Sequence, residues 1–255
     1  MQIFDSHTHI NSSEFKDDLP DVIERAKALD VTRMLVIAYD QPSTDKLLEL
    51  LAFEGIYGAV GCHPESADKW SLDYEKKLVE LFKTQPKLKV LGEIGLDYHC
   101  DLDHELQKKV FARQIKLAQE LNLPISVHNR DAFEDCYEIL KQNQIWKNGG
   151  IMHSFNGDKQ WAQKFLDLGM RLSYSGVVTF SSAKDVKDAA LATPLENILV
   201  ETDAPYLTPH PFRGQMNEPA MTRYTLEYLA QLKGLTAKQL AQITTENTKR
   251  LLKIK

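Results

Sequence analysis

The 255-residue chain has few cysteines, no long apolar run and no excess of positive charge. Its three cysteines are scattered and odd in number, which argues against a disulfide framework and favours a reducing compartment. The longest apolar run extends only from Met34 to Tyr39, far below the ~20 residues that span a bilayer. Because the first residues also lack a basic or apolar leader pattern, we expect a cytoplasmic protein with no membrane partner.

The charge balance limits how the chain could bind nucleic acid. Lys and Arg total 31 against 36 Asp and Glu, so the net charge is −5. A protein that coats DNA through bulk charge would be basic, so any nucleic acid must meet a local pocket instead. With 43% hydrophobic and 26% charged residues, the composition is that of a globular protein and excludes disordered, collagen-like and coiled-coil chains.

Short apolar runs alternate with amphipathic segments along the chain. The clearest helical segment runs from Asp103 to Leu121, where Leu106, Val110 and Leu117 recur at helical spacing and Asp103 can serve as the N-cap. Strands that alternate with helices predict right-handed βαβ units and a parallel sheet. The eight strand-like runs are Gln2–Asp5, Arg33–Ile37, Tyr57–Gly61, Lys89–Glu93, Ile125–His128, Gly150–His153, Arg171–Tyr174 and Ile198–Glu201.

The positions of polar residues favour a closed barrel over a doubly wound open sheet. Eight βα units in about 250 residues match the size of a (β/α)8 TIM barrel, in which active residues gather at the carboxyl ends of many strands. Histidines and carboxylates end or follow most of the apolar runs here. An open sheet would not bring so many strand ends to one point, so we expect an α/β protein with the TIM-barrel fold.

The whole chain, residues 1–255, is expected to form a single domain, because no repeat, low-complexity tract or linker interrupts it. Residues Thr236 to Gln239 match a capping box, which predicts an added C-terminal helix over about 236–253. A proline-rich segment after the eighth run predicts a rigid active-site loop. Its prolines are Pro205, Pro209, Pro211 and Pro219.

The histidines at strand ends predict a metal site. His7 and His9 are two residues apart in an extended segment, so both imidazoles share a face and can reach one metal ion. His128 and His153 close the fifth and sixth runs as polar intrusions at the same end of the sheet. Asp203 follows the eighth run, and the Pro two residues later disfavours a simple helix-cap role.

Glu93 ends the fourth run, where its carboxylate is the natural bridge between two cations. Buried carboxylates need partners, and four neutral imidazoles with two carboxylates balance two divalent ions better than one. Two such ions, roughly 3.5–4 Å apart, form a hydrolytic clamp. Histidine and carboxylate ligands suit Zn, Mn, Co, Fe or Ni, and Mg more weakly.

Seven separated motifs resemble those of the TatD family of metal-dependent deoxyribonucleases, within the wider amidohydrolase-like barrels. They occur in family order from residue 5 to residue 219, and the region of Asn247 is also similar. The matching stretches are 5–9 (DSHTH), 61–64 (GCHP), 92–98 (GEIGLDY), 123–132 (LPISVHNRDA), 153–157 (HSFNG), 201–207 (ETDAPYL), and Arg213-Gly214 with Asn217 and Pro219.

The resemblance implies a role for each candidate residue. Asp203 and Glu93 are the implied catalytic residues, with Asp203 accepting a proton from the attacking water. His63 and Arg130 are implied to lie near the scissile phosphate, and Arg213 can add a bidentate phosphate contact. The implied ligands are His7, His9, Glu93 and Asp203 for one metal, and Glu93, His128 and His153 for a second.

The implied activity is that of a 3′–5′ exodeoxyribonuclease that acts on single-stranded ends. Its partners would be nucleic-acid strand ends or a small phosphodiester, and we expect a monomer. The alternative is an amidohydrolase-type enzyme that cleaves a C–N or ester bond of a small molecule. Many such enzymes bridge their metals with a carboxylated lysine on the fourth strand, where this chain has Glu93. A binding protein with a dead site fits poorly, because every implied ligand position is present.

Overall fold

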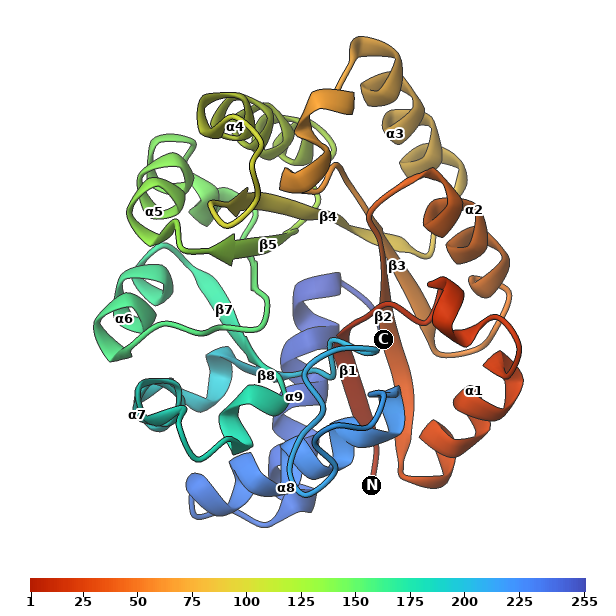
Figure 1. Ribbon diagram of the computed structural model, residues 1–255, viewed down its shortest axis with the longest axis vertical. Coiled ribbons are helices and arrows are strands. Elements are labelled where there is room, and N and C mark those ends of the chain that lie inside the picture. The colour runs from red at the N-terminus through yellow and green to blue at the C-terminus, as the bar shows by residue number, and fades with distance from the viewer.

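A computed structural model describes all residues of the chain, 1–255. Eight parallel strands form one sheet in the order β1 to β8, and they curl into a nearly closed barrel (Figure 1). The prediction of a TIM barrel is therefore confirmed. The strands are β1 (Ile3–Thr8), β2 (Val31–Ala38), β3 (Ile56–Val60), β4 (Leu88–Asp97), β5 (Ile125–Arg130), β6 (Gly150–Met152), β7 (Met170–Tyr174) and β8 (Ile198–Val200).

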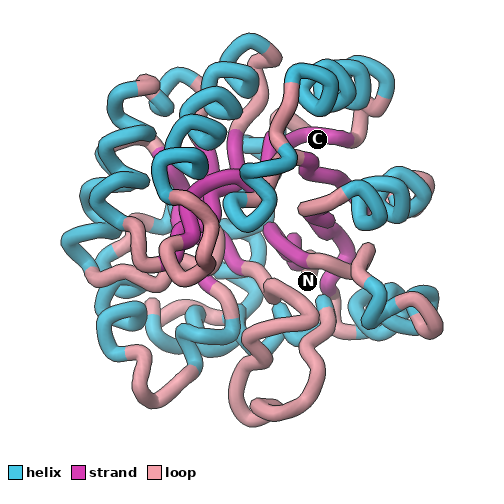
Figure 2. The backbone as a smooth tube through the Cα atoms, turned by 45° about the horizontal axis from the view of Figure 1, so that its top comes forward, coloured by secondary structure: helices cyan, strands magenta, loops and turns pink.

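Helices surround the strands as an outer ring, which Figure 2 shows in cyan around the magenta strands. The α-helices are α1 (Leu19–Ala28), α2 (Gln41–Leu50), α3 (Leu72–Thr84), α4 (His104–Glu120), α5 (Phe133–Gln142), α6 (Lys159–Asp167), α7 (Lys184–Ala192), α8 (Thr222–Leu232) and α9 (Ala237–Leu252). Short 3-10 helices are η1 (Ser13–Phe15), η2 (Pro64–Lys69), η3 (Ile145–Lys147), η4 (Gly176–Thr179), η5 (Leu195–Asn197) and η6 (Pro219–Met221). None of the helices combines the length and apolar character needed to cross a bilayer.

Seven of the eight expected strand ends differ from the structure, five of them by one or two residues and those of β1 and β4 by more. Strand β1 continues through His7 to Thr8, which pairs with Val36, and β4 continues to Asp97, which pairs with Arg130. In β1 the residues after Phe4 are polar although they stay in the ladder, whereas in β4 Glu93 interrupts an apolar run that resumes at Ile94 and Leu96. Strand β8 instead ends at Val200, before the segment that contains Asp203.

The segment after β8 closes the barrel against β1. The backbone N–H of Asp203 donates to the carbonyl of His7 at 2.9 Å, and that of His9 donates to the carbonyl of Ala204 at 2.8 Å. The Asp203 backbone has a left-handed conformation, with φ of 58°. Asp is one of the residues that tolerate this region. Closure therefore ties Asp203 directly to the His7–His9 segment.

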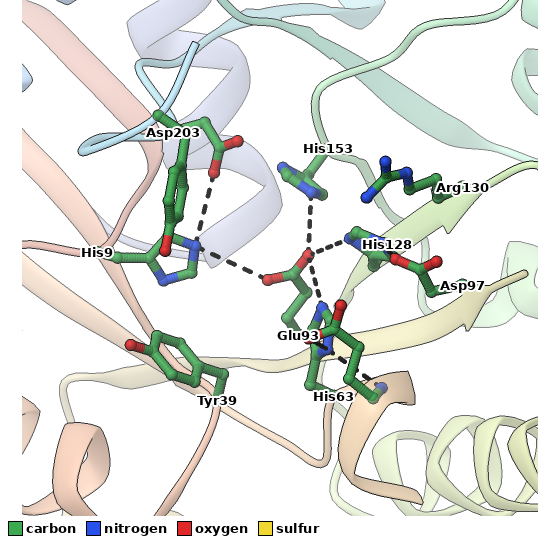
Figure 3. Close-up of a pocket in the computed structure, with 11 residues that line it drawn as sticks. His9, Tyr39, His63, Glu93, Asp97, His128, Arg130, His153 and Asp203 are labelled. Carbon is green, nitrogen blue, oxygen red and sulfur yellow. Dashed lines mark hydrogen bonds and ion pairs between the residues drawn. The ribbon is translucent and has the colours of Figure 1, made fainter. Parts of the chain in front are cut away.

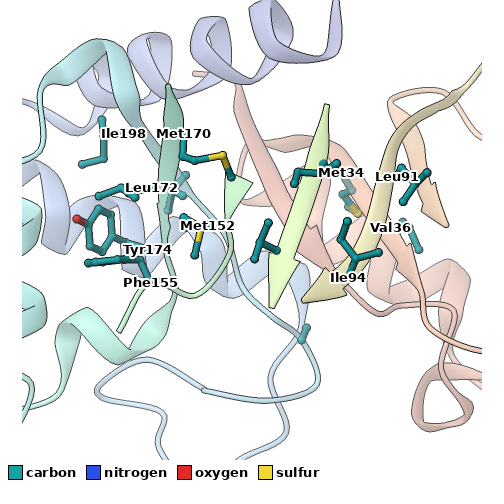
Figure 4. Packing of buried hydrophobic residues seen from close by; sticks show 14 of the residues in the cluster. Met34, Val36, Leu91, Ile94, Met152, Phe155, Met170, Leu172, Tyr174 and Ile198 are labelled. Atoms are coloured by element: carbon teal, nitrogen blue, oxygen red, sulfur yellow. The ribbon is translucent and has the colours of Figure 1, made fainter. Parts of the chain in front are cut away.

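Apolar side chains pack on both surfaces of the barrel wall. The larger cluster lies between the strands and the surrounding helices, and part of it is seen in Figure 4 with Met34, Met152 and Tyr174. A smaller cluster fills the barrel interior and consists of Phe4, Leu35, Ile37, Ala59, Val90, Ile151, Leu199, Leu251 and Leu252. Its two leucines come from the end of α9, so this helix seals the interior beneath the site.

Local signals explain where two of the helices begin. The Asp103 side chain accepts a hydrogen bond from the backbone N–H of Leu106, as expected for the N-cap of α4. At α9, Thr236 and Gln239 form the reciprocal capping box. The side chain of Asn247 in α9 donates to the carbonyl of Ile198 at 3.0 Å, which anchors the helix at the start of β8. The C-terminal helix therefore supports the end of the barrel opposite the polar site.

Candidate metal centre

Polar side chains from strands around the barrel converge in one pocket at the carboxyl end of the sheet. The pocket has a volume of about 390 Å³. His7 lies beneath it and is fully buried. The residues that line the pocket are His9, Tyr39, His63, Glu65, Glu93, Asp97, His128, Arg130, His153, Asp203 and Tyr206 (Figure 3). All six predicted metal ligands thus come together, although they are spread from residue 7 to residue 203.

Glu93 occupies the middle of the cluster, and its two oxygens face different histidines (Figure 3). Oε1 lies 2.9 Å from Nδ1 of His128 and 2.9 Å from Nε2 of His153. Oε2 lies 3.5 Å from Nε2 of His7 and 3.9 Å from Nε2 of His9. Each oxygen therefore faces one pair of the four predicted histidine ligands, and Nε2 of His63 also lies 3.7 Å from Oε1.

Asp203 makes its ion pairs with His7 and His9, and its carboxylate also lies within 4.8 Å of a ring nitrogen of His153. Its Oδ1 lies 3.5 Å from Nε2 of His9 and 3.7 Å from Nε2 of His7. Its side chain is 11% exposed, so it stands between the buried histidines and the open pocket. This location allows one carboxylate to contact both a ligand cluster and a molecule that enters from solvent.

Burial and mutual charge control ionisation in the cluster. Burial opposes ionisation of Glu93, but electrostatic interactions with His153 and His7 hold the pKa of its carboxyl well below the usual range. Burial likewise opposes ionisation of Asp203, yet a hydrogen bond from His9 lowers the pKa of Asp203. Both carboxylates are therefore anionic at neutral pH, and they need cationic partners at this depth.

The donor atoms fit a divalent metal. Three groups of side chains each place their candidate ligand atoms within 4.8 Å of one another: His7, His153 and Asp203; His7, His9 and Glu93; and His63, Glu93 and His128. Imidazole nitrogen and carboxylate oxygen are ligands that suit Zn, Mn, Co, Fe and Ni. The chemistry and spacing of these side chains match what a metal-dependent hydrolase requires.

In each of the four histidines, the ring nitrogen that faces away from Glu93 also contacts a partner. Nδ1 of His7 lies 3.4 Å from Ser126 Oγ, and Nδ1 of His9 lies 3.0 Å from the carbonyl of Ile37. The remaining two rings contact carboxylates instead: His128 Nε2 is 2.9 Å from Asp97 Oδ2, and His153 Nδ1 is 3.2 Å from Glu201 Oε1. Such contacts fix the orientation of a metal-binding imidazole.

His63 and Arg130 both line the pocket, as expected for substrate contacts. The backbone N–H of Glu65 donates to Nδ1 of His63 at 3.3 Å, which favours the proton on Nε2. Burial, offset only in part by Glu93, lowers the pKa of His63 to about 3, so its ring is neutral. His63 can therefore donate an Nε2–H to a bound oxygen without adding a charge.

Arg213 lies elsewhere. It is exposed in the proline-rich loop, with its guanidinium carbon 3.8 Å from the ring centre of Phe180, and it is not part of the pocket lining. The sequence predicted phosphate contacts for both arginines, with Arg213 placed in the proline-rich loop and Arg130 near the scissile phosphate. Only the path of the loop places one beside the cluster and the other outside it.

Sequence reasoning missed several residues at the site. Tyr39 and Tyr206 flank His9 at ring distances of 5.3 and 6.4 Å. The carboxylates of Asp97 and Glu201 contact the rings of His128 and His153 on the side that faces away from Glu93. Asp97 and Glu201 lie in motifs that contain Glu93 and Asp203, which was a usable signal. Tyr39 follows the β2 apolar run, and its aromatic ring gave no reason to separate it from the core.

Comparison with known proteins agrees with this geometry. The family model for TatD related DNase matches residues 4–253. The chain is 44% identical over 254 residues to the uncharacterized metal-dependent hydrolase YabD of Bacillus subtilis, covering 99% of each chain. It is 38% identical over 259 residues to the uncharacterized metal-dependent hydrolase YcfH of Escherichia coli K12, covering 100% of this chain and 97% of YcfH.

Solved structures give the same result. The crystal structure of the TatD homologue YjjV of Escherichia coli K12 superposes with a TM-score of 0.93 at 29% identity, covering 99% of this chain and 98% of YjjV. The fold and the histidine–carboxylate cluster define a barrel hydrolase that depends on a metal. Within that class, the chain belongs to the TatD family of metal-dependent hydrolases.

Proposed function

We propose that this protein is a phosphodiester hydrolase that uses two divalent ions, acting as a TatD-type 3′–5′ exodeoxyribonuclease on single-stranded ends. The observation that carries the proposal is the division of Glu93, whose Oε1 contacts His128 and His153 while Oε2 faces His7 and His9. A carboxylate with a separate histidine pair at each oxygen suits a bridge between two ions.

The chain offers a distinct set of ligands for each ion. His7, His9, Glu93 and Asp203 would hold the first ion. Glu93, His128 and His153 would hold the second. Bound divalent ions supply the charge that polarises a phosphoryl oxygen and lowers the pKa of water toward ~7. Zn, Mn, Co, Fe and Ni suit these ligands, and Mg suits them less.

Protein side chains perform the remaining steps. Asp203, which reaches the pocket beside His9, accepts the proton that the attacking water loses. Arg130 supplies charge-assisted hydrogen bonds to a phosphate, and the neutral His63 donates Nε2–H to a second phosphate oxygen. Both groups line the same pocket as Asp203, so they can orient a phosphodiester for attack.

The shape and charge of the molecule support action at strand ends. A pocket of about 390 Å³ is near the small end of the usual range for ligand sites, so it suits one phosphate and the groups attached to it. The net charge of −5 disfavours extended contact with a duplex. Tyr39 and Tyr206 at the pocket edge can stack against a terminal base, a contact that tolerates any sequence.

A cytoplasmic monomer with one domain over residues 1–255 completes the proposal. All three cysteines are unpaired thiols, and Cys62 and Cys136 are buried, which suits a reducing compartment. Size-exclusion chromatography with light scattering tests the monomer directly, since the chain mass is 29.1 kDa.

The decisive experiment is a substrate panel with metal-reconstituted protein. Single-stranded and duplex oligonucleotides labelled at the 3′ or 5′ end are compared with neutral esters, lactones and cyclic amides. The proposal expects mononucleotides released from the 3′ end of single strands, with none from the Asp203→Asn variant. Turnover of a neutral amide or lactone, with intact oligonucleotides, would support the amidohydrolase alternative instead.

A further inference from the structure

Two buried carboxylates outside the proposed ligand set contact the outer nitrogens of His128 and His153. Asp97 is 1% exposed and Glu201 is fully buried. The corresponding nitrogens of His7 and His9 face a serine hydroxyl and a backbone carbonyl, both uncharged. The two histidine pairs therefore differ in the charge that stands behind them.

The hydrogen bonds also determine which ring nitrogen faces inward. Because Asp97 accepts from His128 Nε2, Nδ1 is the nitrogen of His128 that stays available to a metal, and it points at Glu93. Because Glu201 accepts from His153 Nδ1, Nε2 is the nitrogen of His153 that stays available, and it points at the same Glu93 oxygen. Opposite ring nitrogens thus converge on one point, and the two carboxylates enforce this.

The proposed ligand sets leave the second site short of negative charge. The first ion would have both Asp203 and a share of Glu93, whereas the second would have only a share of Glu93. A divalent cation in a buried site needs compensating charge. Asp97 and Glu201 place two further negative charges behind the histidines of this site.

The surroundings of the two carboxylates indicate that charge, rather than packing, is their contribution. Asp97 Oδ1 accepts from the backbone N–H of His99 at 2.8 Å, which leaves Oδ2 for His128. Glu201 Oε1 accepts from the backbone N–H of Ser154 at 2.7 Å as well as facing His153. The other oxygen of Glu201 is buried without any partner. A lone buried carboxylate oxygen costs stability unless a nearby cation compensates it.

We propose that Asp97 and Glu201 are positioning residues that orient His128 and His153 and, through their negative charge, selectively strengthen binding of the second metal ion. This inference rests on the two-ion arrangement of the proposed function. The uncharged partners Ser126 and Ile37 orient the first pair without adding charge. The two ions are accordingly held by different means.

Metal-binding isotherms test this directly. The full-length chain is stripped with a chelator and equilibrated with Mn²⁺, and bound equivalents are counted after dialysis. The variants Asp97→Asn and Glu201→Gln keep an acceptor oxygen and remove the charge. We expect each to bind one equivalent as tightly as the parent and the other roughly 10- to 100-fold more weakly. Asp97→Ala, which also removes the acceptor, should weaken that equivalent further.

A matched control and a spectroscopic readout separate this role from a general structural one. Ser126→Ala removes the uncharged partner of His7, so any loss it causes should fall on the equivalent held by His7 and His9 and not on the one held by His128 and His153. The electron paramagnetic resonance signal of two Mn²⁺ ions coupled through a shared carboxylate should give way to that of an isolated ion in Asp97→Asn and Glu201→Gln. Circular dichroism confirms that each variant is folded, and Asp97→Asn alone suffices if Glu201→Gln does not fold.

The outcomes distinguish the two proposals. If Asp97→Asn and Glu201→Gln bind two equivalents as tightly as the parent, or lose both equally, the selective role of these carboxylates is overturned. A parent protein that binds only one equivalent would overturn both this inference and the two-ion arrangement. The parent protein could also bind two equivalents of metal and leave oligonucleotides intact, while the variants lose one equivalent. That result would support this inference and refute the proposed nuclease activity.

Discussion

His7 and His153 stack face to face at the barrel mouth, with ring centres 3.8 Å apart and planes inclined by 17°. His7 belongs to β1 and His153 directly follows β6, strands that are not neighbours in the sheet. The rings approach because both are directed at Glu93, one toward each of its oxygens. Glu93 is therefore the side chain whose loss should affect the whole cluster.

Replacing Glu93 with Ala should abolish hydrolysis and lower the bound metal, since both histidine pairs lose their shared carboxylate. The fold should persist, because residues at a barrel mouth serve function more than stability. Metal analysis after gel filtration, activity and circular dichroism measure the three effects. An active Glu93→Ala protein would refute the two-ion arrangement.

The Asp203→Asn variant should retain most of the metal but lose turnover. The amide oxygen can still coordinate, yet it cannot accept a proton from water. Single-turnover rates across pH 6–9, compared with the parent at equal metal content, measure the loss. Equal rates at every pH would restrict Asp203 to coordination.

Arg130 and Arg213 should now behave differently. Arg130→Ala should reduce the stabilisation of the transition state for oligonucleotide hydrolysis by about 1–3 kcal/mol, the scale of a hydrogen bond to a charged group. Arg213, stacked on Phe180 outside the pocket, should matter less for a dinucleotide than for a longer strand. Kinetics on both lengths, at several salt concentrations and beside a neutral ester, separate the two arginines. Equal losses on the ester, without any salt effect, would count against a phosphate contact.

Metal should stabilise the fold, because the buried carboxylates of Glu93 and Asp203 then gain cationic partners. At a free metal concentration of about 100 times Kd, binding adds about 2.7 kcal/mol to the free energy of unfolding. For a chain of this size, that corresponds to a rise in Tm of roughly 5–10 °C. Thermal unfolding in chelator and in Mn²⁺ measures it, with Glu93→Ala as the control that should respond less.

Gly95 should be far less tolerant of substitution than Gly214, although both have positive φ angles. At Gly95, with φ of 146°, an added Cβ would lie 1.9 Å from the carbonyl oxygen of His128. At Gly214, with φ of 90°, it would meet nothing within 4 Å. Denaturant unfolding should show a loss of roughly 2–4 kcal/mol or more for Gly95→Ala. Gly214→Ala should cost about 1 kcal/mol.

The position of each strand was predictable, whereas several strand ends were not. Apolar runs identify the parts of a strand that face the core, so all eight strands were found. The residues after Phe4 in β1 and after Glu93 in β4 remain in the backbone ladder, which depends on neighbouring strands rather than on side-chain hydropathy. For the same reason β8 ends early, because the following backbone N–H groups bond to β1 residues.

The sequence by itself determined the alternation of strands and helices, the barrel class and the six side chains of the candidate metal centre, Glu93 among them. These follow from periodicity and from polar residues at strand ends, which are local properties. The tertiary structure alone decided that His128 and His153 are backed by Asp97 and Glu201, and that Arg213 stacks on Phe180. Such contacts depend on interatomic distances of about 3–4 Å between residues far apart in the chain, and these exist only once the barrel has closed.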